Sequence, residues 1–252
     1  MLHGIQSRLR NSDLFAFNLR NRDRWVAAQA KAIPIGTRVL DAGAGSAPYR
    51  KLFEHCRYET QDFAQLKDDQ LRHGAYGKID HVCDMTAIPV PDGSFGAILC
   101  TEVLEHHPEP IRVVQELARV LAPGGILMLT APLGSGIHQE PYHFYGGYTP
   151  FWYQRFLPAV GLTNVEIEAN AGSLAHFSQE AIRFVRMTAP FRQGMGIVAE
   201  LAWLPIWLLL APVLGLVVPV AAKLMDPFDK VQQFTVGYHV RAIRARERPA
   251  VS

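Results

Sequence analysis

The sequence predicts an α/β fold with a doubly wound sheet, and three observations favour this class. A short apolar run, residues 38–40, ends at an acid and is followed at once by a turn with two glycines. Strand-like and helix-like runs then alternate as far as residue 131, as in a parallel sheet with crossover helices. The 252-residue chain is 49% hydrophobic, so it can fill the core of one large domain that carries an insertion.

Each predicted element has its own local signal. Segment 13–33 mixes apolar and charged residues as amphipathic helices do and ends before Pro34; such helices could cover a ligand site or only pack on the sheet. Thr149 and Pro150 are a typical N-cap and first-turn pair for a helix over 149–157. The predicted strands are 38–40, 58–62, 79–85, 95–100, 125–131, 165–169 and 233–243, and the other predicted helices are 48–55 and 109–121.

The turn after the first strand is typical of a nucleoside-binding site. Gly43 and Gly45 permit a sharp turn and a close approach to a ligand, which in such sheets binds at the carboxyl ends of the strands. Asp41 would repel a pyrophosphate but attract a cation, and Pro48 stands where the dinucleotide pattern has its third glycine. Asp62 ends the next strand, where a carboxylate can accept hydrogen bonds from a ribose diol; a solvated loop acid is the alternative.

Four stretches, taken in order, resemble the motifs of class I S-adenosylmethionine-dependent methyltransferases that act on small molecules. They are 41–45 (D-x-G-x-G), 84–95 (D-x-x-x-I/L-P-F/V-x-D-x-S-F), 103–106 (V-L-E-H) and 116–125 (E-L/I-x-R-V-L-x-P-G-G). After the second stretch, Gly96 replaces the Asp that is usual in the family, at a position that tends to be structural. The resemblance covers residues 36–132 and implies a Rossmann-like, seven-stranded mixed sheet of order 3-2-1-4-5-7-6, with strands six and seven antiparallel.

The resemblance also implies S-adenosylmethionine as the cofactor, together with a set of binding residues. In the family, the acid at Asp84 holds the adenine amino group and Met85 lines the adenine face. The stretch that begins at Thr101 lies beside the expected position of the methyl donor. The cofactor site implied in this way consists of Asp41, Gly43, Gly45, Asp62, Asp84, Met85, Thr101 and Glu102.

Residues 132–149 are rich in His, Tyr and Gly and resemble the H-x-x-P-x-H-x-x-x-Y-(T/S) loop that faces the acceptor in this family. A hydroxyl or ammonium acceptor must lose a proton, and a histidine with a near-neutral pKa suits that task. His143 is the first candidate for this catalytic role, followed by His138 and His106; the alternative is that these side chains anchor the loop by hydrogen bonds. Together with His107 they match no standard metal-ligand spacing, so no metal is predicted.

An uncharged run over 201–222 lies between predicted strands six and seven and is long enough to span a bilayer. Prolines interrupt it every seventh residue and should kink a helix. Because the two flanking strands must pair in one sheet, a single crossing is excluded, which leaves a re-entrant, in-plane or protein-buried segment. Basic residues that suit an anionic inner leaflet flank the run: Arg183, Arg186, Arg192 and Lys223. The alternatives are a homodimer interface and a lid over an apolar substrate.

The predicted organisation is an N-terminal helical cap (1–35), a methyltransferase domain (36–170 and 232–246) and a hydrophobic helical insertion (171–231). A net charge of +2 argues against nucleic acid as a partner. The three cysteines lack metal-ligand spacing and indicate a reducing compartment, and the N-terminus has no secretory pattern. We therefore expect a cytoplasmic protein, peripherally associated with the inner face of the cell membrane.

The function predicted from these observations is methyl transfer to a small or lipid-linked amphipathic acceptor, at oxygen or nitrogen. Such an acceptor could be a lipid-linked sugar, a quinone or phenol, or a polyketide-like molecule. One alternative is a non-catalytic, membrane-bound scaffold with the same fold, although a scaffold need not keep a nucleoside site. A nicotinamide-dependent oxidoreductase is a further alternative, but Pro48 and the absence of a Tyr-x-x-x-Lys pair disfavour it.

Overall fold

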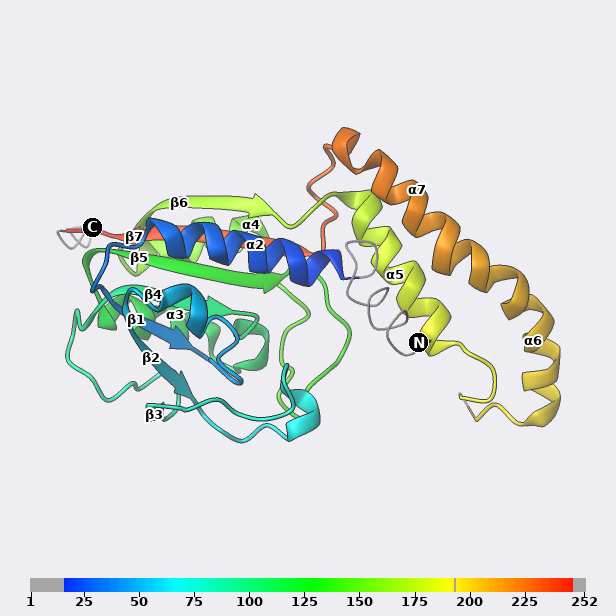
Figure 1. Ribbon diagram of the computed structural model, residues 1–252, viewed down its shortest axis with the longest axis horizontal. Helices are drawn as coiled ribbons and strands as arrows, with labels where there is room; N and C mark the ends of the chain where they lie inside the picture. Colours follow the sequence, from blue (N-terminus) through cyan, green and yellow to red (C-terminus); the bar gives the residue numbers. More distant parts are fainter. Residues whose placement is uncertain (1–15, 193, 247–252) are drawn as a thin grey trace. The chain divides into compact units, whose positions relative to one another are not determined.

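The computed structural model describes residues 16–192 and 194–246 and contains one mixed sheet (Figure 1). Its seven strands run in the order β3-β2-β1-β4-β5-β7-β6, which confirms the predicted order. The strands are β1 (Arg38–Ala42), β2 (Arg57–Asp62), β3 (His81–Val82), β4 (Phe95–Thr101), β5 (Leu121–Pro132), β6 (Leu162–Ala169) and β7 (Gly237–Arg244).

Strand direction brings the functional segments to one edge of the sheet. β1 pairs in parallel with β2 and β4, and β4 pairs in parallel with β5, so their carboxyl ends all lie at the same edge. β7 is antiparallel to β5, with Leu129 opposite Val240. The amide of Ala245 donates to the carbonyl of Gly161, and the Thr163 hydroxyl donates to the Ile243 carbonyl. Residue 161 thus bonds to residue 245, and residue 163 bonds to residue 243. Because the partners run in opposite directions along the chain, β6 is antiparallel to β7, as predicted.

The chain divides into two compact units, which we describe separately. Of the described residues, 22–168 and 237–246 form the sheet unit, and 16–21 and 169–236 form the helical unit. The first turn of helix α2 (Phe17–Ala32) thus groups with the helical unit, while the rest of α2 belongs to the sheet unit. The predicted limits of the insertion, 171 and 231, fall inside the helical unit.

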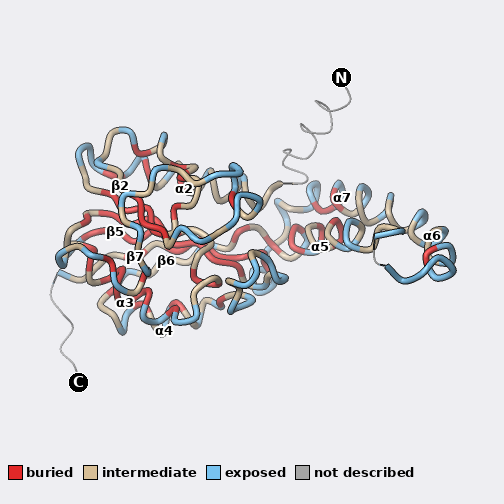
Figure 2. Tube along the Cα trace, turned by 90° about the horizontal axis from the view of Figure 1, so that it is seen from below, coloured by how far each residue is buried: buried red, intermediate tan, exposed pale blue. Residues whose placement is uncertain are grey.

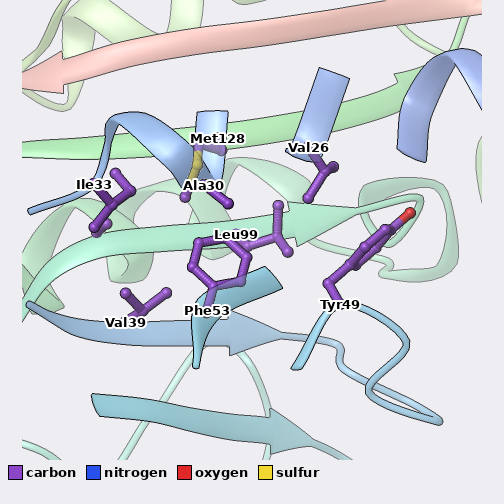
Figure 3. Close-up of a cluster of buried hydrophobic side chains, with 9 residues drawn as sticks. Val26, Ala30, Ile33, Val39, Tyr49, Phe53, Leu99 and Met128 are labelled. Carbon is purple, nitrogen blue, oxygen red and sulfur yellow. The ribbon is translucent and has the colours of Figure 1, made fainter. Parts of the chain in front are cut away.

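Helices cover both faces of the sheet, with α2 on one face and α3 (Pro110–Val120) and α4 (Pro150–Ala159) on the other (Figures 1 and 2). Val26 and Ala30 of α2, with Ile33 directly after the helix, pack over Val39, Leu99 and Met128 of the strands in one buried cluster (Figure 3). Full burial of each Val, Ile, Leu or Met side chain in this cluster stabilises the fold by about 1.5–3 kcal/mol. The Thr149 hydroxyl accepts a hydrogen bond from the Trp152 amide at 3.4 Å, which confirms the predicted cap of α4.

Two local predictions around the glycine turn are wrong. Residues 48–55 form no α-helix but a single 3₁₀ turn, η1 (Arg50–Phe53), whose bonds span three residues. The Cys56 amide donates to the Phe53 carbonyl, three residues back, and the His55 carbonyl accepts from the Gly36 amide at 2.8 Å, so the chain leaves the helical bond pattern just before β2. The strand predicted over 79–85 is only His81–Val82, because the Asp84 side chain accepts from the Thr86 amide at 2.7 Å and starts a turn.

Two further boundaries differ from the prediction. β5 begins at Leu121, directly after α3, so the Pro-Gly-Gly sequence predicted to separate helix and strand lies inside β5. β7 begins at Gly237 instead of residue 233. The Thr235 hydroxyl bonds to the carbonyls of Asn170 and Ala171 at 3.0 and 2.7 Å, which holds this segment within the helical unit.

The helical unit is a hairpin. Its first arm is α5 (Ser173–Met187), and its second arm runs through α6 (Ile197–Pro212), the π-helical turn η4 (Val213–Val217), α7 (Val218–Met225) and the 3₁₀ turn η5 (Asp226–Phe228). Trp203 and Trp207 donate their indole N–H groups to the carbonyls of Thr188 and Val185, at 2.7 and 3.1 Å. These bonds attach the second arm to the first, side by side as in Figure 1.

Buried or well-bonded acids close both ends of the hairpin. The buried Glu200 accepts from the Phe191 amide at 2.7 Å, in the connection between the arms. At the other end, Asp229 accepts from the Leu174 amide at 2.7 Å, in the first turn of α5. The hairpin is therefore held by its own polar groups at both ends.

The second arm is helical without a break over the 32 residues from Ile197 to Phe228. Its most apolar 18-residue window has a mean hydropathy of 2.3 and no buried residue. In length and composition it is the one helix of the described chain that could cross a membrane. The prolines do not end it, and a π-helical turn follows Pro212, where the regular bond pattern is disturbed. Figure 2 shows this arm mostly in the colours of exposed and intermediate residues.

Candidate functional site

The glycine turn after β1 has the sharp geometry that the sequence predicts. Gly43 and Gly45 have φ angles of +72° and +51°, which favour glycine. A Cβ atom on Gly43 would lie 2.5 Å from a methyl carbon of Val103, so the turn also has no space for a side chain there. The amides of Gly43 and Ala44 donate to the Gln61 carbonyl at 2.9 and 3.0 Å, which holds the turn against β2.

Asp62, at the end of β2, shapes the same turn. One carboxylate oxygen accepts from the Gly45 amide at 2.8 Å and the other accepts from the Ala64 amide at 2.9 Å. The side chain is buried, which excludes the solvated loop acid considered above. Each oxygen has a second lone pair, so Asp62 could also accept bonds from a ribose diol.

Asp41 lies inside the sheet unit, near the end of β1. Its carboxylate accepts a hydrogen bond from the Tyr58 hydroxyl of β2. Complete burial raises the pKa of Asp41 to about 7, although the Tyr58 bond opposes the rise. Tyr58 belongs to none of the sequence motifs. It reaches Asp41 only through the register in which β1 pairs with β2.

The predicted adenine-binding residues follow β3. Asp84 accepts from the Thr86 amide and hydroxyl at 2.7 and 2.6 Å, and the His107 ring lies 3.3 Å from the same carboxylate oxygen. Met85 is buried beside it. His107 therefore lies with the predicted cofactor residues and apart from the other three histidines of this edge.

Glu102 follows Thr101 at the end of β4 and connects three elements. Its φ angle of +53° is unusual for a residue with a side chain, a kind of strain that collects at functional sites. The Thr130 hydroxyl of β5 donates to one carboxylate oxygen at 2.8 Å, and Arg22 of α2 lies 3.1 Å from the other. Sequence reasoning missed Arg22, and the ion pair shows that α2 reaches the carboxyl edge of the sheet.

Three of the four histidines come together at this edge. His106 belongs to the short turn η3 (Leu104–His106) after β4, whereas His138 and His143 lie on the loop between β5 and α4. Their ring centroids are 4.7 Å apart for His106–His138 and His138–His143, and 5.6 Å apart for His106–His143.

Other groups hold the loop in place. The Tyr148 hydroxyl donates to the Leu104 carbonyl at 2.7 Å, and the Phe144 amide donates to the Glu105 carbonyl at 2.9 Å. Among described residues, His106 and His138 also bond to loop carbonyls, so the histidines contribute to anchoring.

Burial sets the protonation of this histidine cluster. It lowers the pKa of His106 to about 4, and the neighbouring histidines add to this effect. Burial and the nearby His138 also lower the pKa of His143. Both rings are therefore neutral at neutral pH and can accept a proton. Beside them, burial and the charge of Glu102 raise the pKa of the buried Glu105 well above its ordinary value.

Comparison with known families and sequences gives a consistent result. Residues 40–129 match the family model described as a methyltransferase domain. The chain is 26% identical over 165 residues to the glycine/sarcosine/dimethylglycine N-methyltransferase of Actinopolyspora halophila, covering 58% of this chain and 29% of that protein. It is 31% identical over 115 residues to the ubiquinone biosynthesis O-methyltransferase of Xanthomonas campestris, covering 42% and 46%. The matched part of the chain thus spans less than half the length of each of these two relatives.

Solved structures show the same fold. A putative sarcosine dimethylglycine methyltransferase from Galdieria sulphuraria aligns with a TM-score of 0.55 at 17% identity, covering 90% of this chain and 86% of that one. The [4+2]-cyclase SpnF aligns with a TM-score of 0.54 at 19% identity, covering 90% and 81%. Because one neighbour is described as a cyclase, the fold by itself does not determine the reaction.

Proposed function

We infer that this chain, whose sheet unit belongs to the class I S-adenosylmethionine-dependent methyltransferase family, transfers a methyl group from that cofactor to a small or lipid-linked amphipathic acceptor. One observation carries the proposal. The residues that the motifs assign to the cofactor come from four separate strands, and the sheet brings all four to one edge. The family match over residues 40–129 covers these same segments.

The charges at this edge fit the proposed cofactor. Asp41, Asp62, Asp84 and Glu102 are all acids, whereas S-adenosylmethionine carries an ammonium and a sulfonium and has no phosphate. A pyrophosphate would be repelled by such a group of carboxylates. This disfavours the nicotinamide alternative. A non-catalytic scaffold would have no reason to keep the sharp glycine turn or its bond to Asp62.

The residues of this chain would contribute binding, orientation and proton transfer. Asp62 would bind the ribose and Asp84 the adenine amino group, while the bound cofactor supplies the methyl group on its sulfonium. The histidine cluster would face the acceptor, and His143 would take the proton of a hydroxyl or ammonium acceptor, because its lowered pKa keeps the ring neutral. His138 and His106 are the further candidates for this role.

The second arm of the hairpin would attach the protein to the cytoplasmic face of the membrane. At about 1.5 Å per residue, its 32 residues extend about 48 Å, more than the ~30 Å hydrocarbon core. The first arm, α5, has only 15 residues and is too short to cross. Since β6 and β7 lie in one sheet, the chain has to return to the side from which it left. An arm lying in the membrane interface satisfies both conditions.

A membrane-bound site would suit an acceptor with an apolar part, such as a lipid-linked sugar, a quinone or a phenol. A homodimer through the apolar arm and a lid over an apolar substrate remain the competing uses of the same surface. The relatives named above as N- and O-methyltransferases are consistent with nitrogen or oxygen as the methylated atom.

Transfer of an isotopically labelled methyl group tests the proposed reaction. The purified protein is incubated with a membrane extract of its source and with S-adenosylmethionine carrying a labelled methyl group, and products are detected by mass spectrometry. We expect a labelled product in the lipid-soluble fraction that is absent when Asp62→Ala replaces the wild type. A chain that binds the cofactor yet labels nothing in any fraction would favour the scaffold.

A further inference from the structure

The histidine cluster has the features of a metal site that the spacing of its residues in the sequence does not reveal. His106, His138 and His143 each offer one ring nitrogen, and these atoms all lie within 4.8 Å of one another. The rings are mutually inclined at 53–87°, so they do not stack on one another. We propose that this cluster binds one divalent transition-metal ion of the zinc class.

Backbone carbonyls prepare two of the rings to bind a cation. The Nδ1 atom of His106 lies 2.5 Å from the Tyr142 carbonyl, and Nδ1 of His138 lies 2.9 Å from the Gly136 carbonyl. A carbonyl oxygen can only accept, so each Nδ1 carries the proton and each Nε2 keeps its lone pair. Histidines that bind metals usually have such a second bond, which orients the ring.

The third ring has a nitrogen that lacks a partner. Nδ1 of His143 is buried and makes no hydrogen bond within the described chain. Buried ring nitrogens are normally satisfied, and a bound ion would satisfy this one. Moreover, no hydrogen bond joins the three rings to one another across the described residues, so mutual hydrogen bonding does not explain why they converge.

The donor set selects the class of ion. Three neutral imidazole nitrogens suit Zn²⁺, Co²⁺ or Ni²⁺, whereas Mg²⁺ and Ca²⁺ prefer oxygen. Tetrahedral zinc with Zn–N bonds of about 2.0–2.1 Å places its nitrogens about 3.3 Å apart, so modest side-chain rotations would close the cluster around the ion. Three protein ligands leave the fourth position open, as catalytic zinc sites do.

An ion at this position would alter the proton transfer of the proposed methylation, and this consequence alone rests on the proposed function. An acceptor hydroxyl bound at the open position would have a lower pKa and would release its proton to water. Its oxygen lone pair would then form the O–C bond, while the C–S bond breaks and its electron pair stays on sulfur. Proton acceptance by His143 itself would apply only to the metal-free cluster.

Cobalt titration tests the site directly. The full chain, purified without a polyhistidine tag and stripped with a chelator, is titrated with Co²⁺ and followed by its visible absorption, with Zn²⁺ added in competition. We expect one ion per chain. His138→Ala should weaken binding by more than the roughly 100-fold that loss of an outer hydrogen bond costs. His138 is exposed, so the variant should fold normally, and its melting temperature checks this.

His107→Ala is the matched control, because His107 adjoins His106 in the sequence but lies against Asp84. It should bind Co²⁺ as the wild type does. Absence of a stoichiometric ion, or an equal loss of affinity in His107→Ala and His138→Ala, would overturn the inference. Calorimetry with S-adenosylhomocysteine on the same samples separates the two proposals. A chain that binds this nucleoside but no ion contradicts the metal site alone, and one that binds the ion but not the nucleoside contradicts the proposed function alone.

Discussion

Asp41 is the residue at which the demands of folding and of ligand binding differ most. It is a buried acid, and burial raises its pKa to about 7. The Tyr58 hydroxyl is its hydrogen-bond partner, and no cation is bonded to it among the described residues. A buried charge with so little compensation costs stability, and a cationic ligand would offset that cost. The position of Asp41 is therefore better explained by binding of the proposed ammonium-bearing cofactor than by a contribution to the stability of the fold.

Asp41→Asn should become increasingly more stable than the wild type as the pH rises. In the unfolded chain the carboxyl ionises near the ordinary aspartate pKa of 3.8 and in the folded protein near about 7, so the folded state holds more protons between these values. Wild-type stability attributable to Asp41 therefore falls with rising pH across this window, by up to about 4 kcal/mol at 1.36 kcal/mol per unit. Urea unfolding of both proteins from pH 4 to pH 8 measures the difference.

The comparison of variant with wild type also removes an opposing effect. Burial lowers the pKa of His106 and His239 to about 4, which makes stability rise with pH between about 4 and 6.5 in both proteins. A stability difference that stays constant over the whole range would contradict the account of Asp41.

His143→Ala should lower turnover of the metal-free enzyme without a comparable loss of stability. General-base catalysis contributes about 10²- to 10⁴-fold, so kcat should fall by at least about 100-fold. Its Nδ1 atom makes no hydrogen bond within the described residues, so little structure should be lost with the ring. Steady-state kinetics and melting curves measure the two effects, with the exposed His73→Ala as control. Parallel losses of activity and stability would instead assign His143 to loop anchoring.

At the scale of the elements, the second arm of the hairpin is the most unusual part of the chain. Many of its large apolar side chains are exposed, whereas Pro219 and Ala222 of α7 are buried and the buried residue of α6 is Glu200. The polar bonds that hold the hairpin involve tryptophan indoles and the two acids Glu200 and Asp229, so they do not depend on the exposed leucines. An exposed apolar surface of this extent marks a site of association.

Leu208→Gln/Leu209→Gln should weaken membrane binding without disturbing the hairpin. These side chains are 58% and 74% exposed, and burial of each in the acyl boundary would contribute about 1.5–3 kcal/mol. Binding to vesicles of phosphatidylcholine and phosphatidylglycerol should therefore fall at least tenfold, as measured by co-sedimentation. The matched control is Ile35→Gln/Phe151→Gln, two exposed apolar residues of the sheet unit. Equal effects of both pairs, or a wild type that is soluble and dimeric without detergent, would reject the membrane proposal.

At the scale of the whole molecule, the strand order could be predicted for two reasons. Each strand has a local pattern, and the motifs follow one another along the chain in the order that is typical of the family they resemble. The glycine turn could be predicted as well, since Gly43 directly follows β1 and Gly45 comes two residues later. The ends of individual helices and strands were harder to predict from the sequence. The single turn η1 and the two-residue β3 depend on how far the chain must travel to its neighbours and on the Asp84 side chain.

The contacts that complete the site could not be predicted because they join distant segments without a motif. Arg22 meets Glu102, and Tyr58 meets Asp41, only once the sheet and α2 are assembled. The same holds for the histidine cluster, in which His106 lies more than thirty residues before its two partners along the chain. Sequence spacing excluded a standard metal motif, but spacing carries no information on loops that meet in space.

Calorimetric titration with S-adenosylhomocysteine tests the central claim most directly. The wild-type chain should bind one molecule, and Asp62→Ala should bind it about 10- to 100-fold more weakly, since loss of hydrogen bonds to the ribose costs about 1–3 kcal/mol. Asp62→Asn, which retains an oxygen for the Gly45 amide, separates ribose binding from the shaping of the turn. Tight binding of NADH with no binding of S-adenosylhomocysteine would contradict the account.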